Sequence, residues 1–162
     1  MPFCRYFTGT PVYPFGYGIG LTTFKLSNTT NTPSAVAMQC TGAVMSQSYE
    51  VTVTNTGDRT GDEVVLAFFK PKAETLAAQI GNNQLIRQLF GFERVHLAPG
   101  ESSTVRFNVT PSALQLVDRA TGDRVCTPGT FGIEFTNGVD QSLQASVRIE
   151  GTERVLEKFP IY

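Results

Sequence analysis

The sequence predicts an all-β fold, a β-sandwich of about seven short strands. Three observations predict it. Apolar and polar residues alternate in several short segments, turn signals separate those segments roughly every ten residues, and no long segment repeats with a helical period. The 15 glycines and 9 prolines agree with this fold, because both residues favour turns. A chain of 162 residues is long enough to form one domain with a hydrophobic core.

The N-terminal segment differs from the rest of the chain. Residues 3–24 follow neither a strand period nor a helix period over most of their length, and they are rich in glycine and proline. Aromatic side chains at this density favour burial, and a free-standing domain rarely begins by exposing them. We therefore expect an irregular lead-in over residues 1–21 and a sandwich domain over residues 22–162. The aromatic residues concerned are Phe3, Tyr6, Phe7, Tyr13, Phe15, Tyr17 and Phe24.

The first predicted strands follow the lead-in. Residues 22–26 are a short strand candidate, and the small polar residues at 27–46 are typical of a long loop. Residues 49–54 alternate between apolar and polar side chains, which predicts a half-buried strand. The continuous apolar run over residues 64–69 is short and partly β-branched, so it predicts a strand that is buried on both faces.

The second half of the chain continues this pattern. Residues 72–84 contain a candidate helical turn, and residues 85–97 are extended, with a bulge expected near Glu93. A strand count near seven favours a Greek-key sandwich of the immunoglobulin-like (fibronectin type III-like) kind. Alternation predicts three further strands, at residues 105–109, 131–135 and 143–149. The inward faces predict a core that contains Val51, Val53, Leu66, Phe107, Val109, Phe131, Ile133 and Val147.

The charge balance excludes several classes of partner. Thirteen basic residues against 14 acidic ones leave a net charge of −1, which is not the electrostatic footprint of a protein that binds nucleic acid or an anionic membrane. No apolar run approaches the length needed to span a bilayer. We therefore expect no nucleic-acid partner and no membrane partner.

The cysteines and the sequons leave the compartment open. Cys4, Cys40 and Cys126 show no CxxC spacing, so a zinc site is not expected. One pair could form a disulfide in an oxidising compartment, but three free thiols, at least one of them buried, are the preferred interpretation. The first residues do not form a secretory signal. Two Asn-X-Thr triplets, at Asn28 and Asn108, permit a secreted parent protein without showing one.

Three segments of the chain carry a family resemblance. They are RYFTGTPVYPFGYG at residues 5–18 with TTF at 22–24, VTVTNTGD at 51–58 with GDEVV at 61–65, and RQLFGFERVHLAPGES at 87–102. In order and spacing, these segments resemble the C-terminal region of family 3 glycoside hydrolases. The first segment is more similar to the β-xylosidase and α-arabinofuranosidase branch than to the β-glucosidases. One departure is that residues 19–21 read Ile-Gly-Leu where the family usually has Leu-Ser-Tyr, which removes a hydroxyl and an aromatic ring.

The resemblance implies a non-catalytic role. In that family a (β/α)₈ barrel carries the nucleophilic Asp, a following α/β sandwich usually supplies the acid/base, and a fibronectin type III-like domain follows both. The chain would then be the accessory domain of an enzyme that removes terminal xylose, arabinose or glucose from oligosaccharides. Its partners would be the catalytic domains of the same polypeptide, and the parent would be secreted, although this chain alone does not show the compartment. The interdomain docking residues would be Tyr6, Phe7, Tyr13, Phe15 and Tyr17.

No catalytic motif of the family maps onto this chain. It contains no Ser-Asp pair, and its single histidine, His96, does not follow a lysine and should face solvent. Retaining glycoside hydrolysis needs two carboxyl groups about 5 Å apart, whereas the acids here lie in predicted turns or on outward strand positions such as Glu50 and Glu134. We therefore expect no catalytic residue, no cofactor and no metal ion.

An alternative function stays open at this point. The chain could be a free-standing β-sandwich that binds carbohydrate or protein, or a natural truncated product with its own role. Its aromatic residues could form a platform on which sugars stack, which makes carbohydrate a further candidate partner. The chain has no tryptophan, however, and most of its phenylalanines alternate inward as core, so we prefer the accessory domain.

Overall fold

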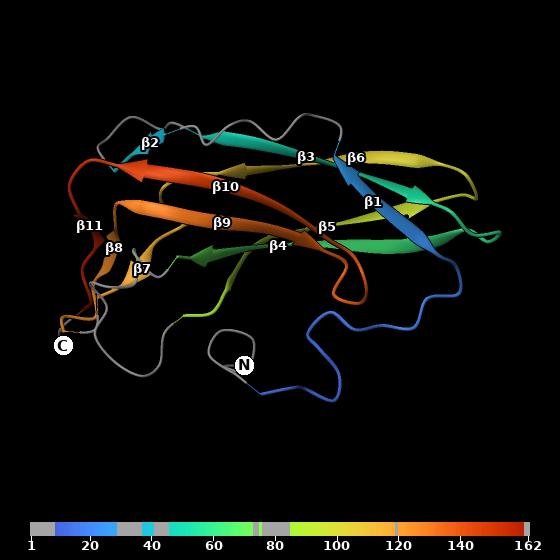
Figure 1. The fold of residues 1–162 in the computed structure, drawn as a ribbon, viewed down its shortest axis with the longest axis horizontal. Coiled ribbons are helices and arrows are strands. Elements are labelled where there is room, and N and C mark those ends of the chain that lie inside the picture. Colours follow the sequence, from blue (N-terminus) through green and yellow to red (C-terminus); the bar gives the residue numbers. More distant parts are fainter. Residues whose placement is uncertain are drawn as a thin grey trace.

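A computed structural model describes residues 9–28, 37–40, 46–72, 75, 85–118 and 120–160. The described part of the chain contains eleven β-strands in three sheets (Figure 1). The strands are β1 (Phe24–Asn28), β2 (Ala37–Gln39), β3 (Gln47–Asn55), β4 (Gly61–Pro71), β5 (Gln88–Leu97), β6 (Ser102–Val109), β7 (Leu116–Val117), β8 (Arg124–Cys126), β9 (Gly129–Thr136), β10 (Ser142–Glu150) and β11 (Arg154–Glu157).

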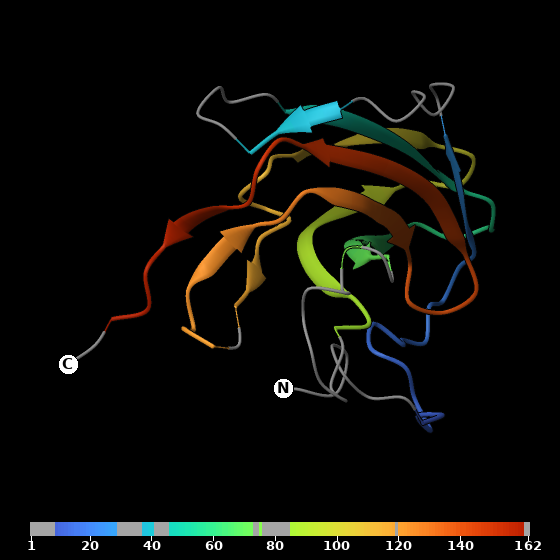
Figure 2. The same ribbon diagram turned by 60° about the vertical axis from the view of Figure 1, so that its left-hand side comes forward.

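Two of the sheets form the predicted sandwich. One has the order β1-β3-β6, and the other has the order β2-β10-β9-β4-β5. The third sheet, β11-β8-β7, is small and lies at one end of the sandwich, as the turned view in Figure 2 shows. β2 pairs with β10 in parallel, whereas the other described pairs are antiparallel. The all-β sandwich is confirmed, with eight strands in its two main sheets.

The core lies between the two main sheets. All eight residues that the sequence places in the core are buried. Seven of them belong to the main cluster, where aromatic rings from both sheets meet, with Phe107 and Tyr49 at 5.2 Å and 5.7 Å from Phe135 between ring centroids. The eighth, Leu66, is 7% exposed but lies outside this cluster, on the opposite face of the five-stranded sheet.

β4 is buried on both faces, as the apolar run predicts. Val65 and Phe69 face the sandwich core, whereas Leu66 and Phe68 face the other side of the sheet, where Phe68 is only 1% exposed. A sheet face that is open to water would leave such side chains exposed. The outer face of the five-stranded sheet is therefore covered by other parts of the chain, and this cover is the basis of the candidate site.

The bulge in β5 lies elsewhere than predicted. Ala67 pairs with Gly91 and Phe68 pairs with Leu89, so the extra residue is Phe90, and the prediction near Glu93 is wrong. Phe92 and Val95 lie on opposite faces of β5 without a bulge between them: Phe92 is on the outer face, opposite Leu66 in the register, and is 65% exposed, whereas Val95 packs against the core. The candidate helical turn in residues 72–84 lies almost entirely outside the described residues.

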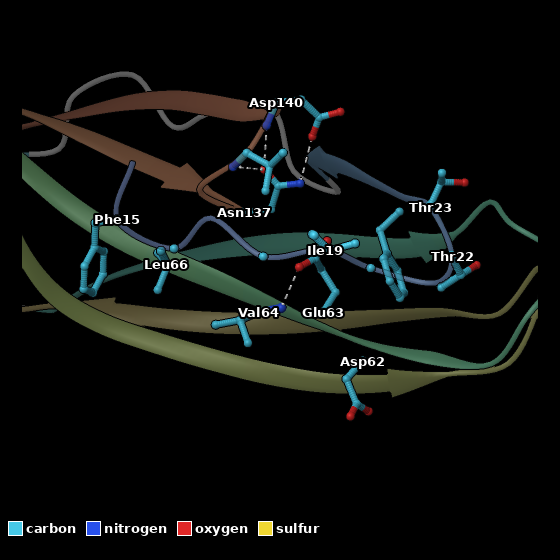
Figure 3. A pocket seen from close by; sticks show the side chains of 15 residues that line it. Phe15, Ile19, Thr22, Thr23, Asp62, Glu63, Val64, Leu66, Asn137 and Asp140 are labelled. Atoms are coloured by element: carbon cyan, nitrogen blue, oxygen red, sulfur yellow. Dashed lines mark hydrogen bonds between the residues drawn. The ribbon is translucent and has the colours of Figure 1, made fainter. Parts of the chain in front are cut away.

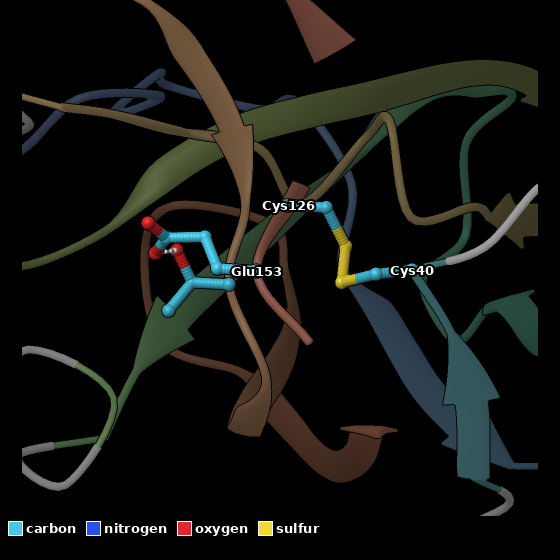
Figure 4. The surroundings of a disulfide bond; sticks show 4 residues. Cys40, Cys126 and Glu153 are labelled. Atoms are coloured by element: carbon cyan, nitrogen blue, oxygen red, sulfur yellow. Dashed lines mark hydrogen bonds between the residues drawn. A yellow bond between two sulfur atoms is a disulfide. The ribbon is translucent and has the colours of Figure 1, made fainter. Parts of the chain in front are cut away.

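The cysteines also differ from the preferred expectation. Cys40, directly after β2, forms a disulfide with Cys126 of β8, with their Cα atoms 5.7 Å apart (Figure 4). The expectation of free thiols is therefore wrong for Cys40 and Cys126. The third cysteine, Cys4, lies outside the described residues. The pairing depends on the position of β2 beside the end of β10, and a three-residue strand leaves no periodic signal in the sequence.

Candidate docking surface

The lead-in lies against the outer side of the five-stranded sheet, and its described part, residues 9–21, contains no regular element (Figures 1 and 2). A turn at Pro14 to Tyr17, closed by a 3.1 Å hydrogen bond from the Tyr17 amide to the Pro14 carbonyl, directs the chain back toward the sheet. Gly16 then approaches the sandwich so closely that a Cβ atom there would be 2.6 Å from Leu66 Cδ1.

Glycine is required at this contact on both sides. Gly16 has φ of +89°, and its backbone packs on Gly138, which has φ of +79° in the turn after β9. A Cβ atom on Gly138 would lie 2.8 Å from the Gly16 Cα atom. Side chains disfavour positive φ, and neither backbone leaves room for one. The two glycines therefore fix where the lead-in crosses the sheet.

Phe15 is the aromatic anchor of the lead-in. Its ring meets the ring of Phe68 edge to face, at 6.3 Å between centroids and 82° between planes. The guanidinium of Arg87 stacks on the same Phe68 ring at 4.4 Å from its centroid. Both contacts cover an apolar strand residue on the outer face of the sheet, so this part of the lead-in belongs to the folded domain.

The other large side chains of the lead-in face solvent. Of the described residues, thirteen large apolar side chains are exposed, and six of them lie within residues 12–21. Tyr13 and Tyr17 form a ring pair at 5.0 Å, and they remain 69% and 45% exposed. We define the lead-in surface as the side chains of Val12, Tyr13, Tyr17, Ile19 and Leu21. It is an apolar patch for which the described part of the chain provides no cover.

The structure brings together three of the five predicted docking residues. Tyr13 and Tyr17 belong to the lead-in surface, and Phe15 anchors that surface from beneath. Tyr6 and Phe7 lie outside the described residues. That these residues dock against another domain stays a prediction.

A cavity of about 570 Å³ lies between the lead-in, the start of β4 and the turn after β9 (Figure 3). The turn is held by Asn137, whose Oδ1 accepts hydrogen bonds from the amides of Val139, Asp140 and Gln141 at 3.1–3.2 Å. Its Nδ2 donates to Asp140 Oδ1 at 2.9 Å. The Asn137 side chain therefore fixes the turn that forms one wall of the cavity.

Two carboxyl groups that line this cavity, Asp62 and Glu63, have pKa values shifted in opposite directions, and that of Glu63 is raised. Glu63 is half-buried, and burial raises the pKa of its carboxyl. Hydrogen bonds from the Val64 amide, at 2.9 Å, and from the Asn137 side chain oppose this rise, whereas the negative charge of Asp140 adds to it. The cavity thus presents acceptor oxygens to a neighbour, and it would favour a partner with hydrogen-bond donors.

Glu134 is a buried carboxylate that the sequence pattern placed in solvent. It lies on the outer face of β9, as alternation predicts, but it is only 8% exposed. Lys70 Nζ lies 2.9 Å and Arg87 Nη1 3.2 Å from its oxygens, and Gln144 and Ser142 donate at 3.0 Å and 3.1 Å. Burial, the largest single effect, would raise the pKa of Glu134, but the hydrogen bonds from Lys70, Gln144 and Ser142 and the positive charge of Lys70 together lower it.

The expectation of a solvated Glu134 is therefore wrong, and its cause is tertiary. Lys70 and Arg87 have long side chains that reach over the sheet face and exclude water from the carboxylate. Sequence alternation reports which face a residue is on, but it does not report what covers that face. The signal available in the sequence was the presence of two cationic residues, Lys70 and Arg87, on segments that lie near the strand that carries Glu134.

His96 faces solvent, as predicted. Its side chain is 71% exposed, and its Nδ1 lies 2.5 Å from Asp62 Oδ1 at the edge of the five-stranded sheet. Arg94 bonds the other oxygen of the same carboxylate. Hydrogen bonds from Arg94 and His96 lower the pKa of Asp62. This cluster is an exposed charge network beside the cavity.

Within the described ranges, no helix has the length and apolar character needed to cross a membrane. The same residues contain no group of three or more His, Cys, Asp or Glu side chains placed to hold a metal ion.

Comparison with known proteins agrees with the β-sandwich fold described above. Residues 63–137 match the family described as "Fibronectin type III-like domain". A β-xylosidase of Formosa agariphila is 36% identical over 129 residues, covering 80% of this chain and 16% of that protein. A periplasmic β-glucosidase of Salmonella typhimurium is 38% identical over 140 residues, covering 85% of this chain and 16% of that protein.

Solved structures show the same domain. A crystallised family 3 (GH3) exo-β-xylosidase, in complex with a xylobiose aziridine probe, superimposes with a TM-score of 0.76 and 28% identity over 95% of this chain and 20% of that one. The chain thus spans a fifth or less of the length of these relatives, and the homologous domain is one part of larger enzymes. The chain therefore belongs with the fibronectin type III-like domains of family 3 β-glucosidases and β-xylosidases.

Proposed function

We propose that this chain is a non-catalytic accessory domain of a family 3 glycoside hydrolase, and that its lead-in docks against the catalytic domains of the same polypeptide. In this proposal residues 1–21 form the interdomain segment and residues 22–162 form the fibronectin type III-like domain. The observation that supports this proposal is that one side of the lead-in contacts the sandwich while its other side is exposed. Phe15 and Gly16 hold the segment on the sandwich, while the lead-in surface faces outward with exposed apolar side chains.

Docking would stabilise the parent enzyme mainly through burial of this surface. Complete removal of one such side chain from water contributes about 1.5–3 kcal/mol. Three members of the surface, Val12, Ile19 and Leu21, are more than 80% exposed, so nearly all of that contribution is available to a partner. Because Phe15 and Gly16 already fix the segment, docking would cost less ordering entropy than docking of a free tail.

The chemistry of the parent is part of the proposal. The similar proteins are named as β-xylosidases and β-glucosidases, which supports a parent that removes terminal xylose, arabinose or glucose from oligosaccharides. The catalytic groups would lie in its other domains, and this chain alone would hydrolyse nothing. One relative is named as periplasmic, which supports a parent exported from the cytoplasm.

The test starts from the gene. We expect the reading frame upstream of codon 1 to encode a barrel and an α/β domain in frame with this chain, and a stop codon with no such segment would contradict the proposal. In the full polypeptide, the triple variant Tyr13→Ser, Tyr17→Ser, Ile19→Ser should lower the thermal midpoint of the catalytic domains. The same variant should leave the unfolding of the isolated chain nearly unchanged, because these side chains are exposed in it.

A matched control uses the opposite side of the sandwich. Thr52 and Thr104 pair through their hydroxyls at 3.0 Å on the exposed outer face of β3 and β6. The double variant Thr52→Ala, Thr104→Ala should leave the catalytic domains unaffected. Equal loss of the catalytic thermal midpoint in both variants would mean that docking does not depend on the lead-in surface.

The second candidate, a free-standing domain that binds carbohydrate, has one observation in its favour. The Tyr13–Tyr17 pair is exposed beside a cavity with acceptor oxygens, and sugars stack on aromatic rings and donate hydrogen bonds. Titration calorimetry of the isolated chain with xylo- and arabino-oligosaccharides separates the two functions. The accessory-domain proposal expects no binding heat, whereas binding that Tyr13→Ser abolishes would favour the alternative.

A further inference from the structure

Edge strand β2 is held to the sandwich by few interactions. It has three residues, and in the described part of the chain its sheet neighbour is β10, which it pairs with in parallel at Arg148–Glu150. One further backbone hydrogen bond, from the Cys40 amide to the Glu150 carbonyl at 3.2 Å, extends this ladder. Short parallel ladders are weak, so pairing alone is a poor attachment for this strand.

The disulfide supplies a covalent attachment across two sheets. Cys40 follows β2 at the edge of the sandwich, whereas Cys126 ends β8 in the small sheet, 86 positions later in the sequence (Figure 4). Both cysteines are buried, at 3% and 0% exposure. Met38, at 1% exposure, is the buried side chain of β2 itself. The strand therefore has two side-chain anchors, and one of them depends on oxidation.

The two strands that the disulfide joins, β2 and β8, differ in how much they need it to stay in place. β8 also pairs with β7 and β11, and Thr127 beside it donates a hydrogen bond to Glu153 at 3.0 Å. The other members of the five-stranded sheet are joined by ladders of six to nine paired residues that do not involve β2. Loss of the disulfide would therefore free β2 first and leave the rest of the sandwich assembled.

We propose that the Cys40–Cys126 disulfide is a redox latch, which holds β2 on β10 when oxidised and releases β2 when reduced. Closing the latch transfers two electrons and two protons from the two thiols to a disulfide-donating oxidoreductase, whose own disulfide becomes a dithiol. Opening it is the reverse exchange, in which an external dithiol reaches the buried sulfurs during local opening of β2, is oxidised to a disulfide, and leaves both cysteines as thiols. Because such bonds persist in oxidising compartments, the latched form belongs to an exported protein. This inference is independent of the docking proposal.

The test compares amide hydrogen exchange in the oxidised chain, in the chain reduced with dithiothreitol, and in the double variant Cys40→Ala, Cys126→Ala. We expect exchange to accelerate about tenfold or more in peptides that cover residues 37–40 and 148–150, while β9 and β4 stay protected. The matched control is Cys4→Ala, which removes the third cysteine and should behave as the wild type. Mass spectrometry of thiols alkylated after unfolding without reductant should find one free thiol in the untreated protein.

Three results would overturn the latch. The first is three free thiols in protein prepared under oxidising conditions. The second is unchanged exchange at residues 37–40 once alkylation shows that both cysteines are reduced, or in the double variant. The third is faster exchange throughout β9 and β4, or a double variant that does not fold, because the disulfide would then stabilise the whole domain and would not be a local latch.

Discussion

Replacing Tyr49 by phenylalanine should change how the stability of the domain depends on alkaline pH. The Tyr49 ring is 5% exposed and lies between the two sheets, where its hydroxyl donates to the Ser146 carbonyl at 3.2 Å. Burial raises the pKa of Tyr49 to about 12 from its ordinary value of 10.0. The folded state therefore disfavours the charged phenolate much more than the unfolded state does.

The sign and the size of the effect follow from this difference. A group whose pKa is raised on folding contributes stability that is present below its unfolded pKa and is lost as the pH rises through its folded pKa. For Tyr49 the window is about pH 10 to 12, and two pKa units correspond to about 2.7 kcal/mol of lost unfolding free energy. At pH 8 the variant loses only the hydrogen bond to Ser146, a net cost of about 1 kcal/mol.

The two stability curves should therefore cross. Tyr49→Phe should be less stable than the wild type at pH 8 by about 1 kcal/mol, and more stable by about 1 kcal/mol near pH 12, because phenylalanine cannot ionise. Urea unfolding after rapid mixing into each buffer measures both free energies while keeping the exposure to alkali brief. The control Tyr13→Phe removes the hydroxyl of a side chain that is 69% exposed, and its curve should run parallel to the wild type.

A constant difference between Tyr49→Phe and the wild type from pH 8 to pH 12 would refute this reasoning. It would mean that the Tyr49 hydroxyl reaches water in the folded state, and hence that the contact between the sheets at Tyr49 and Ser146 is looser than described.

Three further predictions concern chemistry, core and acid stability. The isolated chain should release no nitrophenol from nitrophenyl xylosides or arabinosides, and release that copurifies with the chain, after host enzymes are excluded, would contradict the proposed non-catalytic role. Phe107→Ala and Phe131→Ala, at side chains 5% and 0% exposed, should each cost about 3–5 kcal/mol in urea unfolding, and losses below about 1 kcal/mol at both would show that the inward faces are misassigned. Because the pKa of Glu134 is lowered on folding, its stabilisation is present above the unfolded pKa of about 4.3 and is lost as the pH falls through the folded pKa. Glu134→Gln should therefore flatten the acid limb of the stability curve, and an unchanged acid limb would show that its ion pairs contribute nothing.

Alternation predicted the parts of the fold that repeat with period two. β3, β6, β9 and β10 were found because their inward residues form one face of a pleated strand, and β4 was found because its apolar run is too short for most helices. The strand β2 has only three residues, so it has no period to detect. The disulfide was missed for the same reason, because β2 positions Cys40, one of its two cysteines.

The candidate site was predictable only in outline. Aromatic density marked Tyr13, Phe15 and Tyr17 in the lead-in, but it did not separate the anchor Phe15 from the outward pair. That separation arises from contacts with Phe68 and other residues more than fifty positions away in the sequence. The burial of Glu134 likewise depends on side chains from other segments, which no local pattern reports.

An exposed aromatic segment such as the lead-in can have two roles. It can be a docking surface for other domains, or it can be a piece of this domain's own core, and a single experiment on the lead-in separates the two. The contacts of Phe15 and Gly16 belong to the second role, whereas the exposure of the lead-in surface supports the first role, which we propose. Because Phe15 itself remains 42% exposed, its contact with Phe68 should contribute less than about 2 kcal/mol.

The most direct measurement of the docking claim is therefore deletion of residues 1–20, with mass by light scattering and stability by urea and thermal unfolding. We predict that the full chain self-associates through its lead-in surface as the concentration rises, and that the deletion variant is monomeric with an unfolding free energy lower by less than about 2 kcal/mol. A full chain that is monomeric at all concentrations, together with a deletion that strongly destabilises the sandwich, would contradict the account, because the lead-in would then be part of the domain's own core.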